Sequence, residues 1–425
     1  MLGRFKNLGR ALSISVLNQV ISSGTNFAII VYLVRSLDKE QFGLYSLGFA
    51  LTLLVAGLTS SLISTQFVVN LPDQAIDQRR IYAAGHAVAL LVLGFGAVGF
   101  GALLIWVQIP LQLGAVDLRP FLLPVTVSAT FFALREFFVR VAYSEREETI
   151  ALLSSISVAC AVIVSFGLLA IKQHPIFAQT AIYIYGGGQF FGALVALLLL
   201  RLPRHGVSKA GLTTAFRDSW PGGRWNILTN LIYNVRTQVH NLLVGPILGA
   251  VALAEVNAAR VLVTPAIMMI PPLTQILLPR LAEKRNQGVD RLFRIALMFV
   301  GLLAAIASAY SLILLAGLSW IIPLVLGDQY AHVGPLVLAW CVVALLLASR
   351  NGLTIALQAL RAFRDLMLAN LISAIFAVLA AIIMIQLFFA PGAVWALAIS
   401  ELVLCVVLIA MIRSWRRAGP TANNA

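Results

Sequence analysis

Five arginines stand inside long apolar segments of the sequence: Arg135, Arg140, Arg236, Arg260 and Arg350. A charge inside a membrane-spanning segment is costly, and it usually faces a cavity. A guanidinium group binds phosphate through two parallel N–H···O bonds. The five arginines therefore predict a cationic cavity for an anionic group. A structural role is the alternative, with each guanidinium paired to Glu255, Glu401 or a backbone carbonyl, or reaching the membrane interface.

Polar side chains accompany the arginines in the segment around Arg236. His240 follows Arg236 by four residues, so the two share one face of a helix. Asn230 and Asn234 recur at the same spacing and are candidates to donate hydrogen bonds to sugar hydroxyl groups; hydrogen bonding between helices is the alternative. Tyr233 lies on the same side of the helix as Arg236 and is a candidate to stack on a sugar face; ordinary packing is the alternative.

Two acidic residues, Glu136 and Glu401, also lie well inside apolar segments, and we interpret them as candidates for ion coupling. The sequence has no GxxxxGK[ST] loop for ATP, no HExxH motif and no cysteine or histidine spacing typical of a metal site. No Ser/His/Asp arrangement can be assigned. These absences predict a protein that is not an enzyme and that uses no cofactor and no metal.

The composition places most of the chain in lipid. Of its 425 residues, 60% are hydrophobic and 11% are charged, whereas about 25% are charged in ordinary soluble domains. Twelve apolar segments are long enough for membrane-spanning helices: 12–34, 42–69, 82–107, 120–143, 150–171, 177–200, 225–248, 252–279, 293–318, 333–357, 366–389 and 392–412. We therefore predict an all-α integral membrane protein with about 12 transmembrane helices.

The basic residues indicate an orientation for these helices. Most of the 30 Lys and Arg residues fall on one side of the predicted membrane, and only Arg35, Lys39, Arg119 and Lys172 fall on the other. Loops rich in Lys and Arg stay in the cytoplasm, so we expect both termini there. The net charge of +14 then needs no nucleic-acid partner to explain it.

A weak internal repeat divides the chain into two halves. Three features recur at nearly constant offset: Asn18, Ser22 and Thr25 with Asn230, Asn234 and Thr237; PLQLG at 110–114 with PLVLG at 323–327; and Arg135 and Arg146 with Arg350 and Arg361. We predict two six-helix lobes, at 1–200 and 225–414, around a central cavity. Residues 201–224 are expected to form a cytoplasmic linker, with an interfacial helix as an alternative, and residues 415–425 a cytoplasmic tail.

Several stretches resemble the polysaccharide transporters of the multidrug/oligosaccharidyl-lipid/polysaccharide exporter superfamily. The first helix is polar, Arg35-Ser36-Leu37 forms a corner after it, and Phe42-Gly43-Leu44-Tyr45 leads into the second helix. LLVGPILGAVALAEVNAARVL at 242–262 is similar to the family's turn into helix eight. PLVLGDQYAHVGPLV at 323–337 resembles its segment between helices nine and ten. The resemblance extends over essentially the whole chain in length, span count and order.

This resemblance implies a flippase in the bacterial inner membrane. Its expected cargo is a polyprenyl-diphosphate-linked oligosaccharide for surface polysaccharides such as lipopolysaccharide or exopolysaccharide. It would move this cargo from the cytoplasmic to the outer leaflet by alternating access, with a polysaccharide polymerase and export proteins as partners. Two alternatives are an ion-coupled multidrug exporter of the same superfamily and a membrane glycan polymerase or ligase. A positive cavity disfavours cationic drugs, and the short predicted outer loops disfavour the enzyme.

Overall fold

The computed structural model describes residues 2–114, 116–203, 206–270, 281, 289–360 and 362–418, with side chains from residue 13 onward except those of residues 289, 290, 359, 363, 417 and 418. Two compact units make up the chain. The first consists of Met1–Ile29 and Leu44–Leu231, and the second of Ile30–Gly43 and Ile232–Ala425. The predicted division differs from these units in two places, because the corner at 30–43 belongs to the second unit and the stretch at 201–231 to the first.

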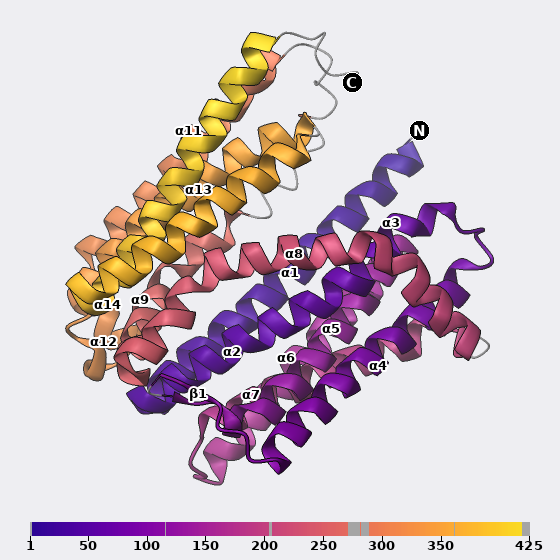
Figure 1. The fold of residues 1–425 in the computed structure, drawn as a ribbon, viewed down its shortest axis with the longest axis horizontal. Coiled ribbons are helices and arrows are strands. Elements are labelled where there is room, and N and C mark those ends of the chain that lie inside the picture. Colours follow the sequence, from indigo (N-terminus) through magenta and orange to yellow (C-terminus); the bar gives the residue numbers. More distant parts are fainter. Residues whose placement is uncertain are drawn as a thin grey trace. The chain divides into compact units, whose positions relative to one another are not determined.

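The first unit is built around helix α5. Its helices are α1 (Leu2–Ser36, whose last residues enter the second unit), α2 (Lys39–Thr59), α3 (Thr65–Asn70), α4 (Arg79–Trp106), α5 (Leu122–Ser144), α6 (Glu148–Ile171) and α7 (Ala178–Leu200). A π-helical turn at Ser60–Ser64 joins α2 to α3, and 3₁₀ turns lie at Leu71–Asp73 and Arg119–Phe121. Helix α5 packs against α4, α6 and α7, and α6 packs against α7 (Figure 1). Phe67, Phe137, Phe138 and Ile63 are fully buried in its core.

The described part of the chain contains one small departure from the all-α prediction. Strands β1 (Gln112–Leu113) and β2 (Val116–Asp117) form an antiparallel hairpin between α4 and α5. Gln112 pairs with Asp117, and Leu113 pairs with Val116. The hairpin is too short to alter the fold class.

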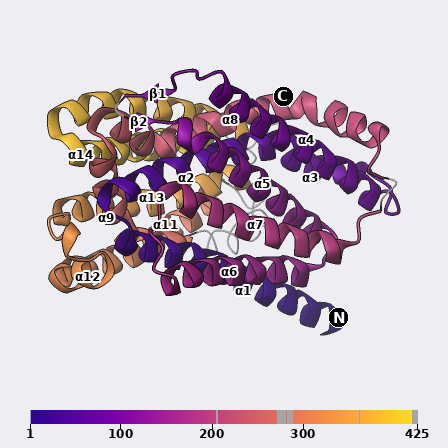
Figure 2. The ribbon, with the colours of Figure 1, turned by 90° about the horizontal axis from the view of Figure 1, so that it is seen from below.

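The second unit packs its helices around α13. They are α9 (Ala250–Met268), α11 (Val289–Ala316), α12 (Leu318–Val325), α13 (Gly334–Ala359) and α14 (Phe363–Ala418), with a 3₁₀ turn at Asp328–Tyr330. Helix α13 contacts α9, α11 and α14 (Figure 2). The backbone of α14 leaves helical geometry at Phe389, so this element consists of two helices, in agreement with the predicted segments 366–389 and 392–412.

Helix α8 (Lys209–Leu248) replaces the predicted linker and seventh span with one continuous element. Its first turns pack on the first unit, where Asn70 donates a hydrogen bond to the Asp218 carbonyl and Ala215 joins the core. Trp220 is exposed, which suits an aromatic side chain at a membrane interface. The stretch at 209–224 is therefore ordered helix that packs on the core.

The corner between α1 and α2 is fixed to the second unit by polar contacts. Arg35 donates a hydrogen bond to the Leu324 carbonyl. Lys39 Nζ lies 2.9 Å from Glu255 Oε1, and His332 Nε2 lies 2.7 Å from the same oxygen. Glu255 therefore pairs with Lys39 and His332 in the described structure.

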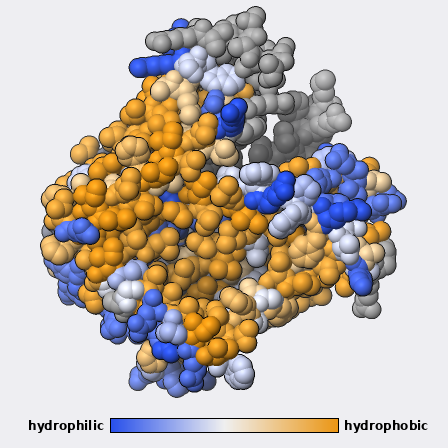
Figure 3. All heavy atoms as spheres, viewed as in Figure 1, coloured by the Kyte–Doolittle hydropathy of each residue, from blue (hydrophilic) through white to orange (hydrophobic). Residues whose placement is uncertain are grey.

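The lengths and the surface of the helices suit a membrane. Ten helices in the described part of the chain are long and apolar enough to cross one. The last of them contains both helices of α14, and the more polar α8 is also long enough. Apolar side chains cover most of the surface seen in Figure 3, and many large ones are exposed. The protein is a multi-pass membrane protein with about 12 helices, as the sequence predicts.

The Phe-Gly-x-Tyr step into α2 has a steric reason. A Cβ atom on Gly43 would lie 2.6 Å from the carbonyl carbon of Ala250, closer than real contacts allow. We expect Gly43→Ala to lower the free energy of unfolding by about 1–3 kcal/mol, the usual cost of overpacking. Thermal unfolding of the purified protein measures this. Gly24→Ala is the matched control, because no atom lies within 4 Å of its added Cβ; equal stability of the two variants would contradict the explanation.

Candidate functional site

Three charged side chains meet inside the second unit. Arg236 on α8 donates a hydrogen bond from Nη1 to Oε1 of Glu401 on α14. Arg350 on α13 places Nε 3.0 Å from Oε2 of the same carboxylate, an ion pair that lacks hydrogen-bond geometry. The side chains are 0%, 12% and 1% exposed for Arg236, Arg350 and Glu401. Two guanidinium groups share one carboxylate, so the cluster carries one uncompensated positive charge.

Donor groups of this cluster lack partners. Nε and Nη2 of Arg236 are buried without a hydrogen-bond partner among the described residues. A buried N–H group without a partner costs free energy, and the cost is larger for a charged group. The Arg236 guanidinium carbon also lies over the ring of Tyr233, 5.6 Å from its centroid. Arg236 therefore has two N–H groups that its hydrogen bond to Glu401 does not use.

His240 and Arg260 gather around a tryptophan that the sequence interpretation missed. Trp340 on α13 is buried and donates a hydrogen bond from Nε1 to the Val256 carbonyl, 2.9 Å away. The His240 ring meets it edge-on with centroids 5.2 Å apart, and the Arg260 guanidinium lies 5.5 Å from its centroid. Both ring nitrogens of His240 are buried and unpartnered in the described structure. A tryptophan within an apolar segment gives no sequence signal of this role.

The asparagines of α8 serve different purposes. Asn226 donates to the Ser61 carbonyl on the π-helical turn, and Asn257 on α9 donates to Asn241 on α8. These two bonds join helices, which is the structural alternative for the polar residues of this segment. Asn234 is buried, and Asn230 lies in the first unit, where its Oδ1 would be 2.8 Å from a Cβ on Gly57.

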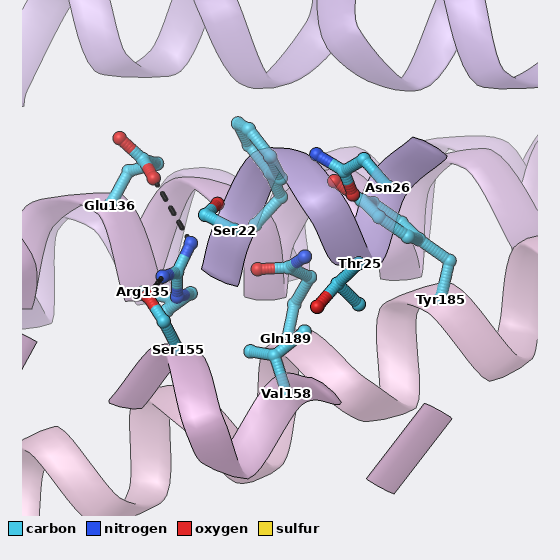
Figure 4. A pocket seen from close by; sticks show the side chains of 10 residues that line it. Ser22, Thr25, Asn26, Arg135, Glu136, Ser155, Val158, Tyr185 and Gln189 are labelled. Carbon is cyan, nitrogen blue, oxygen red and sulfur yellow. Dashed lines mark hydrogen bonds and ion pairs between the residues drawn. The ribbon is translucent and has the colours of Figure 1, made fainter. Parts of the chain in front are cut away.

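In the first unit, Arg135 on α5 is tied into a network of side chains. It donates to Glu136 over 3.2 Å, to Ser154 over 3.3 Å and to Ser155 over 2.5 Å. Ser155 in turn donates to Asn18 Oδ1 on α1. Figure 4 shows the Arg135 guanidinium directed at Glu136 beside a pocket. Arg135 therefore has a structural role, but its partners are Glu136 and two serines rather than the predicted Glu255, Glu401 or backbone carbonyls.

Arg140 does not join this network. Its Nη1 donates to Thr65 Oγ1 over 3.3 Å, one and a half turns along α5 from Arg135. The structure thus divides the predicted site residues into four groups. Arg236 and Arg350 pair with the Glu401 carboxylate, and Tyr233 lies at Arg236. His240 and Arg260 contact Trp340, Arg135 pairs with Glu136, and Arg140 bonds to Thr65. Among the described residues, no group of three or more His, Cys, Asp or Glu side chains can hold a metal ion.

The sequence of the chain matches the model of a known family. The match spans residues 8–285, more than half of the chain, and the family is described as polysaccharide biosynthesis protein. The chain belongs to this family. The predicted resemblance to polysaccharide transporters is therefore confirmed. No curated protein matches the chain in sequence.

Solved structures of transporters share the fold of this family member. The lipid II flippase MurJ in an inward closed conformation matches with a TM-score of 0.77 at 10% identity, over 94% of this chain and 87% of that one. An inward-facing multidrug resistance MATE family transporter of the MOP superfamily matches with a TM-score of 0.69 at 14% identity, over 94% and 95% of the two chains. At these identities the likeness establishes the fold.

Proposed function

We propose that the protein is a flippase that moves a polyprenyl-diphosphate-linked oligosaccharide from the cytoplasmic to the outer leaflet. The observation that carries the proposal is the buried cluster of Arg236, Arg350 and Glu401, with its excess guanidinium and its unpartnered N–H groups. A diphosphate is the anionic group at the junction of lipid and sugar. Guanidinium groups bind phosphate oxygens in pairs, so the cluster suits that junction.

The family and the fold also support a flippase function. A polysaccharide biosynthesis family needs its lipid-linked intermediates moved across a membrane, and the fold is one that a flippase and multidrug transporters share. We propose that the two lobes alternate access to a central cavity. For the diphosphate we propose Arg236 and Arg350. Of the other arginines predicted for this cavity, Arg135 pairs with Glu136 and Arg140 with Thr65.

The cellular setting is part of the proposal. We place the protein in the bacterial inner membrane with both termini in the cytoplasm, where most of the basic residues would then lie. A polysaccharide polymerase and export proteins would act on the flipped product, which would become lipopolysaccharide or exopolysaccharide. Glu401 is the better placed of the two coupling candidates, because it holds the two guanidinium groups that an anion would contact.

The multidrug exporter remains the second candidate, because MATE transporters share the fold. Its usual cargo is an amphipathic cation, which the positive cluster repels. The charge of the cargo separates the two functions: a flippase of this kind needs Arg350 for an anionic lipid, whereas a cation exporter would work as well or better without it.

Removing one guanidinium tests the proposal. In a host whose surface polysaccharide depends on this protein, we expect Arg350→Gln to lower the surface polysaccharide at least tenfold. The lipid-linked oligosaccharide should accumulate in the cytoplasmic leaflet. Arg236 would still pair with Glu401, so the variant should insert at normal levels.

Arg217→Gln is the matched control, because this arginine is largely exposed at the start of α8. It should leave polysaccharide levels unchanged. Normal polysaccharide in the Arg350→Gln host, with normal protein levels, would reject the assignment of this cluster to the cargo.

A further inference from the structure

A pocket of about 90 Å³ lies wholly inside the first unit, among helices α1, α5, α6 and α7. Its polar wall includes Arg135, Glu136, Gln189 and Thr25, and its apolar wall includes Tyr185 and Phe132. Figure 4 shows the Gln189 amide directed into the space between Arg135 and Thr25. The pocket is separate from the Arg236 cluster, which belongs to the second unit.

The size of the pocket limits its occupant. A buried water molecule needs about 10–15 Å³ of such space, so the pocket has room for roughly six to nine waters. That is much more than one ion or one water requires, and much less than a lipid chain requires. A group of several heavy atoms, such as part of a sugar residue, fits this range.

The charge of the pocket favours a neutral occupant. Nη1 of Arg135 lies 3.2 Å from Glu136 Oε1, so one positive and one negative group face each other across the wall. Ser154 and Ser155 take two further N–H groups of Arg135. The guanidinium is therefore compensated, and the pocket lacks the excess positive charge that a phosphate would need.

A buried acceptor in the wall needs a donor. Gln189 is 2% exposed. Its amide group is hydrogen-bonded to the Tyr185 side chain, and its Oε1 has no hydrogen-bond partner among the described residues. The Thr25 hydroxyl, which also lines the pocket, donates its hydrogen bond to the Ile21 carbonyl, 2.7 Å away. Its oxygen can therefore only accept a further hydrogen bond. Buried polar atoms are almost always hydrogen-bonded, so Gln189 Oε1 calls for an occupant with O–H or N–H groups.

Part of the pocket lining is aromatic. The rings of Phe132 and Tyr185 stack with centroids 6.2 Å apart and an angle of 24° between their planes. A sugar residue combines hydroxyl groups on its edge with C–H groups on its ring face. The polar residues of the lining suit the hydroxyl groups, and the aromatic rings suit the C–H face of the sugar.

We infer that this pocket is a subsite for part of one neutral sugar residue of the cargo, with Gln189 Oε1 accepting a hydrogen bond from a sugar hydroxyl or amide. The inference rests on the proposed function and adds to it, because it assigns sugar recognition to the first unit and leaves the diphosphate to the second. Arg135 and Glu136 then hold the shape of the subsite and hydrogen-bond the sugar.

Lipid binding with and without a sugar tests the inference. The probes are undecaprenyl diphosphate and its derivatives that carry one glucose, galactose or N-acetylglucosamine residue, titrated into the purified protein in detergent by calorimetry. We expect the wild type to bind at least one sugar-bearing lipid about tenfold more tightly than the bare lipid. Gln189→Leu should remove that gain and leave the affinity for the bare lipid unchanged.

Gln179→Leu is the matched control, because it makes the same change on the same helix outside the pocket. It should keep the wild-type preference. If Gln189→Leu binds all four lipids like the wild type, the pocket holds water only and the inference is wrong; the same holds if no sugar improves binding to the wild type. Failure of the wild type to bind even the bare lipid would instead reject the proposed function.

Discussion

Glu401→Gln is expected to destabilise the protein by about 3–5 kcal/mol, the cost of removing one partner from a buried ion pair. The glutamine keeps the size of the side chain and one carbonyl oxygen, but it loses the negative charge. Arg236 and Arg350 would then face each other without a counter-charge, and Arg236 is fully buried. Thermal unfolding of the purified variant, followed by tryptophan fluorescence, measures the loss.

Because two arginines share one glutamate, removing Arg350 is a control for removing Glu401. Removing Arg350 leaves Arg236 and Glu401 as a neutral pair, so Arg350→Gln should cost much less than Glu401→Gln. In the double variant only one unpaired guanidinium remains, so Arg350→Gln should recover part of the stability lost in Glu401→Gln. Additive losses would show that the three charges do not interact, and that outcome would contradict the cluster.

The helices of this protein could be predicted from the sequence because lipid imposes a simple rule. A span needs about 20 apolar residues, and segments such as 150–171 match their helices within a few residues, here Glu148–Ile171. Helix α8 shows where the rule stops. Its first turns are polar, and the contacts that keep them helical, such as Asn70 with Asp218, come from residues far away in the sequence.

The pairing of charges could not be predicted in the same way. Spacing shows that Arg236 and His240 share a helix face, but Glu401 lies 165 residues from Arg236, and no periodic pattern links them. The sequence interpretation named Glu401 as one possible partner of the arginines without assigning it. Gln189 was within reach, since it is a polar amide in the middle of the apolar segment 177–200.

Trp340→Ala is expected to cost about 3–5 kcal/mol, the usual range for removing a buried tryptophan. The side chain is 1% exposed, and it contacts α9 through the Val256 carbonyl and α8 through His240. The alanine would leave a cavity at the meeting point of three helices. It would also remove the ring below the Arg260 guanidinium, and a cation over a desolvated aromatic face gains about 2 kcal/mol.

Trp340→Phe separates the ring from the hydrogen bond. Phenylalanine keeps an aromatic face for Arg260 and an edge for His240 but cannot donate to the Val256 carbonyl, so we expect a loss of about 0.5–1.5 kcal/mol from the hydrogen bond, plus a smaller cavity. If Trp340→Phe were as damaging as Trp340→Ala, the hydrogen bond would outweigh the ring. If Trp340→Ala changed the unfolding free energy by less than about 1 kcal/mol, the site could relax to fill the space, and Trp340 would not be what positions His240 and Arg260.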